Sequence, residues 1–295
     1  MHKLSTEKRA SILTALVEGN SINSTARICG CSKVTVLRLL ADAGTIAAAW
    51  HDEHARNLQA ERVQADEIWS FVGCKDKAKK AGASGLGSVW TWIAMDSDTK
   101  LAITYTLGGR EQDDANDFAM DLRSRVSNMI QLTTDGLGLY EKAVRRAFGS
   151  KGIDYAQVIK QYGNPPREAQ ARYSPGVCIG CEKKRVIGVA FGEDISTSHV
   201  ERQNLTLRMQ SRRYTRLTNA FSKKVENHWH ALNLHFWHYN WARRHKTLKT
   251  TPAVAAGIAN RRMLISELVE NLEAAEAKVG GRVTDYLPSP GKDSK

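Results

Sequence analysis

Apolar and polar residues in the middle of the chain alternate in patterns that predict three neighbouring strands. Residues 64–73 are rich in the β-branched and aromatic side chains typical of a buried strand, and Gly73 ends the run. Residues 89–95 and 101–107 predict two more strands, and the polar segment 96–98 between them is typical of a turn. Because tight turns join antiparallel neighbours, we expect antiparallel pairing here.

A helix and a further strand are predicted next. Apolar residues recur with helical spacing over residues 113–126, and residues 129–135 fit a strand that ends at Asp135 and Gly136. Residues 139–148 fit a short helix. A strand, a helix and a second strand imply a crossover and a parallel pair. The sequence therefore predicts an α/β fold with a mixed sheet flanked by helices, to which residues 155–162 can add a strand.

The first 45 residues have the spacing of a helix-turn-helix domain. Residues 22–41 fit two helices that cross at the small Ala26 and turn at Gly30. The alternative is a plain three-helix bundle without a ligand. Residues 46–62 are interpreted as a polar helical linker. The second helix would be capped by Ser32, and its outer face would offer DNA the side chains of Ser32, Lys33, Thr35 and Arg38.

The C-terminal part of the chain is predicted to be helical. A helix over about residues 221–245 has two apolar faces, so we expect burial on both sides, within the domain or against a second subunit. Its four histidines are expected to form polar rims around the aromatic packing. Residues 251–295 are interpreted as a C-terminal helix and a loose tail after Gly280. The acidic helical stretch 264–277 suggests an exposed arm or a dimer contact.

The charge of the chain indicates a polyanionic partner. Among 295 residues the hydrophobic share of 42% and the charged share of 25% are ordinary for a folded soluble protein, but the formal charge is +12. Such an excess favours nucleic acid before membrane. Residues 202–249 hold eleven Lys and Arg and one acid, interleaved with aromatic residues. The basic candidates for DNA contacts there are Arg208, Arg212, Arg213, Lys223, Lys224, Arg243 and Arg244.

Neither a signal peptide nor an apolar run long enough to span a bilayer is evident, so a cytoplasmic, nucleoid-associated protein is expected. The five cysteines do not suggest a disulfide framework. Cys178 and Cys181 have the spacing of a zinc knuckle. One pair cannot complete a tetrahedral zinc site, so zinc is not expected.

Carboxylates mark the ends of two predicted strands. Asp66 and Glu67 are adjacent in residues 64–73, and alternation allows only one of the two to point at a given site. Asp66 and Asp135 could meet at neighbouring strand ends, where their repulsion would call for divalent cations. Hard oxygen ligands select Mg²⁺ or Mn²⁺. The alternative for Asp66 is an exposed strand end.

A third acidic residue begins a predicted helix. Glu201 shares one helical face with Asn204 and Arg208, a combination suited to a phosphate. The alternative is structural, because Ser198 and Glu201 have the spacing of a capping box.

With these motifs the sequence resembles a DDE transposase of the bacterial insertion-sequence-one family. The motifs are Asp66-Glu-Ile-Trp-Ser-Phe-Val-Gly73, Thr134-Asp-Gly136 with Leu139-Tyr-Glu141, Val200-Glu-Arg-Gln-Asn-Leu-Thr-Leu-Arg208, and Phe221-Ser-Lys223 with the Trp- and His-rich helix after it. The resemblance covers about residues 60–250. It implies an RNase H-like catalytic domain over residues 63–250, with Asp66, Asp135 and Glu201 as the catalytic, metal-binding triad.

The activity implied by the resemblance is DNA transposition by phosphoryl transfer with two Mg²⁺ or Mn²⁺ ions. The protein would bind double-stranded transposon ends and target DNA as a homo-oligomer, at least a dimer. Asn204 and Arg208 would position the phosphate, with His199 as an auxiliary candidate.

The chain departs from short family members in two ways. It begins directly with the predicted helix-turn-helix, whereas short members carry a zinc-binding region before it. Also, 65 residues separate Asp135 from Glu201, and residues 142–195 are interpreted as an insertion. Glu182 and Glu193 are the nearest competitors of Glu201. Two other functions are open: an RNase H-like nuclease or resolvase that cuts without joining, and a non-catalytic helix-turn-helix regulator.

Overall fold

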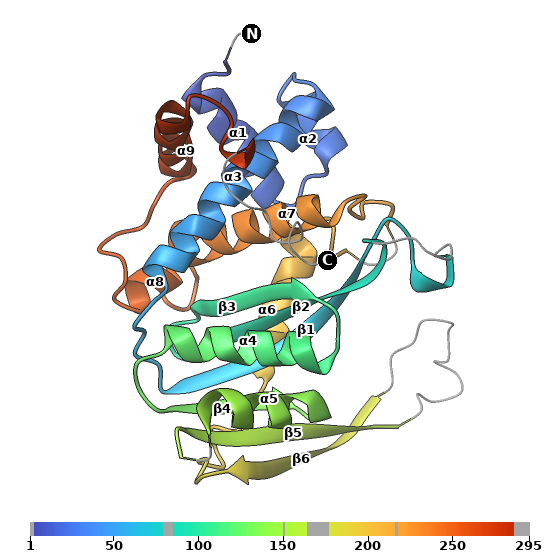
Figure 1. The fold of residues 1–295 in the computed structure, drawn as a ribbon, viewed down its shortest axis with the longest axis vertical. Helices are drawn as coiled ribbons and strands as arrows, with labels where there is room; N and C mark the ends of the chain where they lie inside the picture. Colours follow the sequence, from blue (N-terminus) through green and yellow to red (C-terminus); the bar gives the residue numbers. More distant parts are fainter. Residues whose placement is uncertain (1–2, 79–84, 150, 164–176, 216–217, 286–295) are drawn as a thin grey trace.

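The computed structural model describes residues 3–78, 85–149, 151–163, 177–215 and 218–285 (Figure 1). Its centre is one six-stranded sheet. The strands are β1 (Arg62–Val72), β2 (Gly87–Asp96), β3 (Ala102–Gly108), β4 (Ile130–Asp135), β5 (Ile153–Gly163) and β6 (Val177–Ile187), in the spatial order β3-β2-β1-β4-β5-β6.

Pairing in the sheet is mixed. β1, β2 and β3 pair antiparallel, as the turns between them predict. β4 runs parallel to β1 and β5 runs parallel to β4, whereas β6 returns antiparallel to β5. This topology is that of an RNase H-like fold, so the predicted fold class is confirmed.

Asp96 and Asp98 have structural roles in the turn between β2 and β3. Asp96 Oδ1 accepts a hydrogen bond from the backbone N–H of Asp98 at 3.0 Å, and Asp98 forms an ion pair with Arg62. These carboxylates are therefore committed to the turn and to the start of β1, as turn composition indicates.

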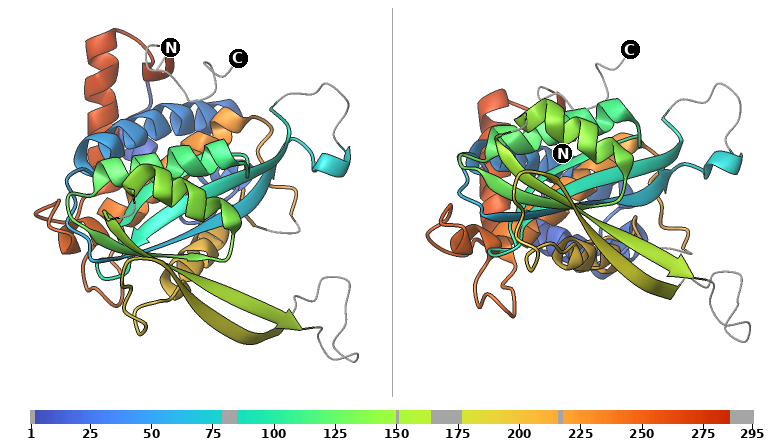
Figure 2. Two further views of the ribbon diagram at one scale, coloured as in Figure 1. Left: turned by 60° about the horizontal axis from the view of Figure 1, so that its bottom comes forward. Right: turned by 90° about the horizontal axis from the view of Figure 1, so that it is seen from below.

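Helices cover both faces of the sheet (Figure 2). On one face, α4 (Gln112–Arg125) and α5 (Gly138–Phe148) bury Phe118 and Tyr140 against Trp92 of β2. On the other face, α6 (Ser198–Gln210) and α7 (Val225–Trp237) pack on Ile68 and Ile93.

The two apolar faces predicted for residues 221–245 are both buried within the chain. Leu232 and Phe236 of α7 pack toward the sheet, whereas Leu234 and Trp237 join the core that includes the N-terminal helices. The helix begins later than predicted, at Val225, and a π-helical turn (His238–Ala242) follows it.

The sequence suggested that the histidines of this segment form polar rims around the aromatic packing, and this prediction is wrong. His228, His230, His235 and His238 are all buried, and desolvation lowers the pKa of each to about 3 or 4. They are neutral members of the core.

Three helices form the N-terminal part: α1 (Thr6–Val17), α2 (Ile22–Ile28) and α3 (Lys33–His54). The turn between α2 and α3 uses Gly30 at φ +56°, and Ser32 caps α3 by accepting a hydrogen bond from the N–H of Thr35 at 3.0 Å. These helices lie where the sequence predicts them, and their role in DNA binding stays a prediction.

α3 continues across residue 45, where the sequence analysis placed the end of the first domain. Residues 43–47 and His51 in its second half are buried, and His51 Nε2 lies 3.0 Å from the carbonyl oxygen of Ile103 in β3. At Gly44 the backbone of α3 meets α7 so closely that a Cβ would lie 2.6 Å from the carbonyl oxygen of His230. Most of the predicted linker is therefore a helix packed on the sheet and on α7.

The C-terminal extension packs on the N-terminal helices. α8 (Pro252–Ala255) starts at Thr251 with proline in its first turn, as predicted. α9 (Ile265–Val279) buries Leu268 and Leu272 beside α1 and α3, and Glu276 forms an ion pair with Arg9 of α1 at 3.0 Å. The predicted exposed arm is therefore wrong, and the alternative, a dimer contact, stays a prediction.

The loose tail expected after Gly280 is wrong for its first residues. Arg282 forms an ion pair with Asp42 of α3 at 2.9 Å, and Val283 is buried. The rest of the predicted tail, residues 286–295, lies outside the described residues.

Residues 142–195, interpreted as an insertion, contribute β5 and β6 to the sheet. β5 pairs with β4 from Ile153 to Val158, so this part of the span is integral to the central sheet. Beyond it, β5 and β6 extend together as a twisted hairpin that projects from the body (Figure 2). Cys178 and Cys181 are exposed on β6.

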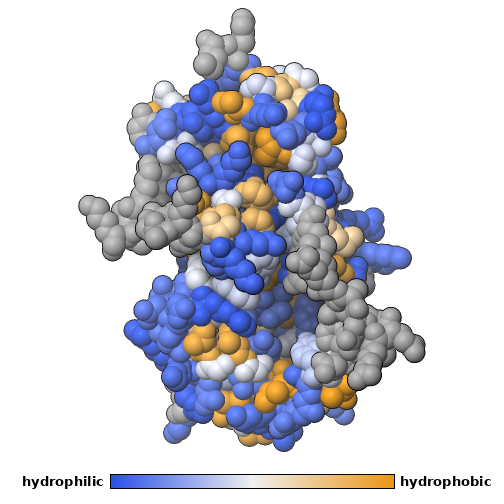
Figure 3. Space-filling model, turned by 90° about the vertical axis from the view of Figure 1, so that its right-hand side faces the viewer, coloured by the Kyte–Doolittle hydropathy of each residue, from blue (hydrophilic) through white to orange (hydrophobic). Residues whose placement is uncertain are grey.

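The surface shown in Figure 3 is mainly hydrophilic, with hydrophobic residues in small separate patches. None of the helices within the described residues is long and apolar enough to cross a membrane.

Candidate active site

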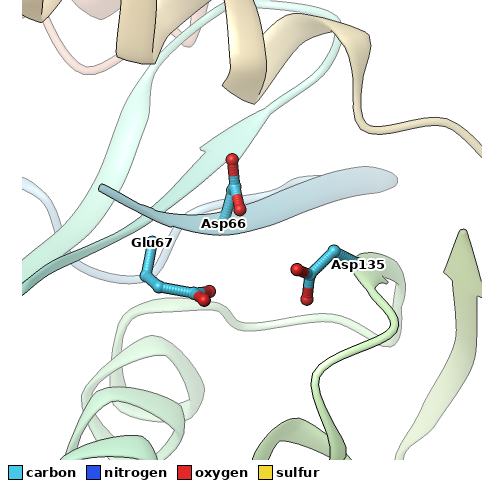
Figure 4. A group of neighbouring side chains, drawn as sticks. All are labelled: Asp66, Glu67 and Asp135. Atoms are coloured by element: carbon cyan, nitrogen blue, oxygen red, sulfur yellow. The ribbon is translucent and has the colours of Figure 1, made fainter. Parts of the chain in front are cut away.

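Three carboxylates meet where β1 and β4 separate. The two strands pair in parallel only over Arg62–Gln64 and Gln131–Thr133. Asp66 and Glu67 follow on β1, and Asp135 ends β4. One oxygen of each carboxylate lies within 4.8 Å of the others, and this is the one such acidic group found in the described parts of the chain (Figure 4). The predicted meeting of Asp66 and Asp135 is therefore observed.

Asp66 lies on the face of β1 that α6 covers. Asn204 Nδ2 donates a hydrogen bond to Asp66 Oδ2 at 2.8 Å. Two residues earlier, Gln64 Oε1 accepts hydrogen bonds from the backbone N–H groups of His199 and Val200 at 2.8 and 3.2 Å. The start of α6 is thus fastened to β1, and Asn204 is held over Asp66.

Glu67 lies on the opposite face of β1, as alternation predicts, and its side chain is 2% exposed. Glu67 Oε1 accepts from Arg110 Nε at 3.0 Å and Nη2 at 2.5 Å, and Oε2 accepts from the Tyr140 hydroxyl at 3.1 Å. Arg110 also stacks over Trp90, with its guanidinium carbon 4.4 Å from the ring centroid. These bonds direct the Glu67 carboxylate past the strand edge toward Asp135 (Figure 4).

Sequence reasoning missed Glu67 as a member of the cluster. Alternation places neighbouring side chains on opposite faces of a sheet. Where two strands separate, however, side chains from both faces can reach the same point. Two adjacent acids within one apolar strand were the signal that could have found it.

Burial and mutual repulsion raise the pKa of each carboxyl group in this cluster. Burial, then the charges of Glu67 and Asp135, raise the pKa of Asp66 to about 7. Burial is also the main cause of the raised pKa of Glu67 and of Asp135. Asp135 Oδ1 accepts from the backbone N–H of Leu137 at 2.9 Å, which fixes its orientation and partly opposes the shift. A cation at this point would remove the repulsion.

Glu201 lies in the first turn of α6, outside the group of three. Its carboxylate accepts hydrogen bonds from Lys160 of β5 and from the Thr197 hydroxyl. The charge of Glu201 contributes to the raised pKa of both Asp66 and Asp135, so it acts on the same site. Lys160 was not singled out from the sequence, because nothing in a strand pattern predicts its partner across the sheet.

The capping alternative for Glu201 is not realised in the predicted form. The residue before the helix is Thr197, and its side chain bonds to the Glu201 carboxylate and not to a backbone N–H. Ser198 is the first residue of the helix. The competing acids, Glu182 of β6 and Glu193, are both exposed and lie outside the group of three.

Arg208, predicted to position a phosphate, Arg213, a predicted DNA contact, and the auxiliary candidate His199 lie in different environments. Arg208 is half-buried and its Nη1 lies 3.4 Å from the carbonyl oxygen of Tyr214. Arg213 Nη1 donates to Ser222 Oγ at 2.6 Å. His199 Nε2 lies 3.0 Å from Lys100 Nζ, and burial, followed by the charge of Lys100, lowers the pKa of His199.

The other predicted DNA contacts are at the surface. Thr35 and Arg243 are half-buried, and the exposed residues are Ser32, Lys33, Arg38, Arg212, Lys223, Lys224 and Arg244. Their binding roles stay predictions.

The donor set fits a hard divalent cation. Asp66 and Asp135 offer carboxylate oxygens in a partly buried setting that disfavours their own negative charge. Magnesium and manganese prefer such ligands, whereas zinc prefers nitrogen and sulfur.

The strand order, the mixed pairing and the acidic cluster define an RNase H-like protein with a carboxylate site. Residues 62–174 match the family described as IS1 transposase. This match confirms the resemblance to the insertion-sequence-one transposases over the segment that contains Asp66, Glu67 and Asp135.

A curated relative and solved structures are also similar. The insertion element iso-IS1n protein InsB of Shigella dysenteriae is 27% identical over 163 residues, covering 55% of this chain and 84% of that protein. The structure of the Mos1 strand transfer complex covers 95% of this chain and 80% of its own chain, at 11% identity and a TM-score of 0.33. A pre-cleavage Mos1 transpososome covers 95% and 81%, at 12% identity and a TM-score of 0.30.

Proposed function

We propose that this protein is a DNA transposase that binds transposon ends and carries out metal-dependent strand cleavage and strand transfer. The observation that carries the proposal is the meeting of Asp66 and Asp135 within 4.8 Å inside the segment that matches the IS1 transposases. Carboxylates at the point where two parallel strands separate are suited to hold cations against a DNA phosphate.

Asp66 and Asp135 would hold the cations, with Glu201 or Glu67 as the third carboxylate. Bound Mg²⁺ or Mn²⁺ supplies activation of the attacking oxygen and neutralises charge at the scissile phosphate. Asn204 orients Asp66 through its 2.8 Å hydrogen bond. Lys160 holds Glu201 beside the cluster, and Arg110 holds Glu67.

Glu67 and Glu201, the two candidates for the third carboxylate, differ in how firmly their side chains are held. Both oxygens of Glu67 accept hydrogen bonds, from Arg110 and Tyr140, and its side chain is 2% exposed. Glu201 is 40% exposed and paired with a lysine that a cation could displace. Glu201 is therefore the better ligand, and Glu67 the residue that adds negative charge and keeps β1 in place.

DNA would be held by the basic residues of the segment after α6 and by the N-terminal helices. Both ends of a transposon must be brought together for strand transfer, so a homo-oligomer of at least two chains is part of the proposal. The names of the two similar Mos1 structures, a strand transfer complex and a transpososome, support this view.

The proposal is tested with labelled transposon-end DNA and the variants Asp66→Ala, Asp135→Ala, Glu201→Gln and Glu67→Gln. We expect the first three to lose nicking and joining by at least a hundredfold while DNA binding changes little. Glu67→Gln should keep a measurable fraction of activity. Mn²⁺ binding by calorimetry should be lost in Glu201→Gln and weakened in Glu67→Gln, and the reverse order would exchange the two roles.

The product pattern separates the alternatives. Joined products are required for a transposase. Cutting without joining would make the protein a nuclease or resolvase, and DNA binding without nicking at any Mg²⁺ or Mn²⁺ concentration would make it a regulator.

A further inference from the structure

Arg110 lies just beyond β3, and its side chain reaches the carboxylate cluster. Its Nε and Nη2 donate to Glu67 Oε1 at 3.0 and 2.5 Å. Its charge also partly opposes the rise in the pKa of Asp135. The carboxylates of Glu67 and Asp135 approach each other where β1 and β4 separate, so the guanidinium acts on the same point (Figure 4).

The backbone on both sides of Arg110 is fastened to its neighbours. Asp114 of α4 accepts hydrogen bonds from the N–H of Gly109 at 2.8 Å and from the N–H of Glu111 at 3.1 Å. The carbonyl oxygen of Gly109 accepts from Trp92 Nε1 at 3.0 Å. The position from which the Arg110 side chain extends is therefore fixed in the free protein, as a preorganised binding residue requires.

The guanidinium group of Arg110 is itself held on two sides. Its flat face lies over the ring of Trp90, and one edge faces Glu67. Arginine has five N–H donors, and the described residues offer no acceptor to those on Nη1. The side chain is 40% exposed. A ligand that arrives from solvent therefore meets a guanidinium that is positioned but not saturated with hydrogen bonds.

The ion pair with Glu67 does not use the full capacity of the arginine. Both bonds end on the single oxygen Oε1, and Tyr140 donates to Oε2 at 3.1 Å. A fork-to-fork pair would engage both oxygens of the carboxylate. One side of the planar group is thus left for a second acceptor, and phosphate oxygens match this group as well as carboxylate oxygens do.

A phosphodiester at the carboxylate cluster would need a cation at this place. Glu67 lies within 4.8 Å of Asp66 and Asp135, and its charge would repel a phosphate brought to them. A guanidinium that keeps one edge on Glu67 and turns another toward the phosphate binds both anions at once. Arginine suits this role because it is always charged and donates along more than one edge.

We propose that Arg110 binds the DNA phosphate at which the carboxylate cluster acts, donating from Nη1 to a phosphate oxygen while Nε and Nη2 stay on Glu67. Arg110 is then a phosphate-binding residue as well as the partner that holds Glu67 in place. The inference rests on the proposed function, because the phosphate is that of a transposon end.

The test measures binding of a transposon-end duplex to the full chain, with Ca²⁺ in place of Mg²⁺ because Ca²⁺ also binds carboxylate oxygens. Denaturing gels check that the DNA stays intact. We expect Arg110→Gln to weaken binding roughly tenfold to a hundredfold, the effect of losing a hydrogen bond between charged groups. The slope of log K against log salt should fall in magnitude by about 0.9.

Arg123→Gln is the matched control. Arg123 is exposed at the other end of α4 and, like Arg110, lies over an aromatic ring, with 5.8 Å between its guanidinium carbon and the centroid of Phe148. The substitution removes the same charge away from the carboxylates and should leave binding unchanged. Circular dichroism checks that each variant is folded.

The contacted phosphate is located with neutral methylphosphonates. Duplexes that carry one such group at successive positions around the end of the element are compared for the natural protein and Arg110→Gln. At the phosphate that Arg110 binds, neutralisation should erase the difference between the two proteins, because both changes remove the same interaction. A residue that only holds Glu67 would show no such position.

A second comparison separates phosphate binding from support of Glu67. If Arg110 acted only through Glu67, Arg110→Gln would have no further effect on DNA binding in a protein that already carries Glu67→Gln. We expect a loss of at least tenfold in that background as well.

Every result decides the proposal. One phosphate at the end of the element, with a loss that persists in the Glu67→Gln background, supports it. It is overturned by unchanged binding in Arg110→Gln, by an equal loss in Arg123→Gln, by a loss that no neutralised phosphate at the element's end erases, or by a loss that vanishes in the Glu67→Gln background. Nicking and joining without such a phosphate would overturn this inference alone. Such a phosphate without nicking or joining would overturn the transposase proposal alone.

Discussion

Asp66→Asn should stabilise the metal-free protein while removing its ability to hold a cation. The carboxylate of Asp66 is buried beside Glu67 and Asp135, which raises its pKa from 3.8 to about 7. A neutral amide would not repel them. The buried Oδ1 of Asn204 has no partner among the described residues, and the new amide nitrogen could donate to it.

The magnitude follows from the pKa shift. About three pKa units at about 1.4 kcal/mol each correspond to about 4 kcal/mol of destabilisation when Asp66 is ionised. For a chain of this size that is roughly 8 °C in melting temperature. Rearrangement of neighbouring side chains in the native protein absorbs part of the repulsion, so the expected rise is roughly 4–8 °C.

The pH dependence has a definite sign. An acid whose pKa is raised in the folded state destabilises that state above the raised value, and the penalty disappears below the ordinary value. The gain in Asp66→Asn should therefore be full above about pH 7 and should vanish below about pH 4.

The assay is thermal unfolding in EDTA at pH 8, pH 6 and the lowest pH at which the protein stays folded. Asp117→Asn on the exposed side of α4 is the matched control and should show no gain. Excess Mg²⁺ should raise the melting temperature of the natural protein and leave that of Asp66→Asn unchanged. No gain at pH 8, or an equal gain at every pH, would refute the reasoning.

Two further substitutions test the packing and the ion pair beside the site. Gly44→Ala should destabilise the protein by about 1–3 kcal/mol in urea unfolding, because the new Cβ would lie 2.6 Å from the backbone of His230. This loss is expected although alanine normally favours a helix. The control is Gly138→Ala, whose Cβ would face open space and which should be neutral or stabilising. Lys160→Gln should cost less than about 1 kcal/mol of stability, since Lys160 and Glu201 are both partly exposed. The substitution should also tighten Mn²⁺ binding about two- to threefold, because it releases Glu201 from the ion pair. Unchanged or weaker Mn²⁺ binding would argue against Glu201 as a ligand.

Local sequence patterns were sufficient for the strands and for two of the carboxylates. The crossover between β1 and β4 follows from the order of strand and helix patterns, and it brings Asp66 and Asp135 to one place. The two apolar faces of α7 were also readable, because each has its own helical spacing. In each case a short stretch of sequence contains the physical cause.

Other features depend on contacts between residues far apart in the sequence, which no local pattern predicts. The Glu67 carboxylate reaches the cluster because β1 and β4 pair over only three residues and because Arg110 and Tyr140 direct it. The acidic stripe of α9 reads as solvent-exposed, yet Glu276 meets Arg9 of α1 from the far end of the chain. Spacing alone cannot supply such contacts.

The boundary predicted near residue 45 shows the same limit. The sequence predicted that residues 46–62 were helical, but no local pattern showed that this helix packs on the sheet and on α7. The close approach of α3 to α7 at Gly44 depends on His230, far along the chain.

The uninterrupted length of α3 has a mechanical consequence. Its 22 residues span about 33 Å, close to one turn of B-form DNA at about 34 Å. The capped end at Ser32 carries the predicted DNA-reading side chains, and the other end is fastened to β3 through His51 and to α4 through Arg125, which pairs with Asp52 at 3.1 Å. Under the proposed function, α3 would therefore help to set the distance between the DNA that its N-terminal end contacts and the bond that is cut at the carboxylates.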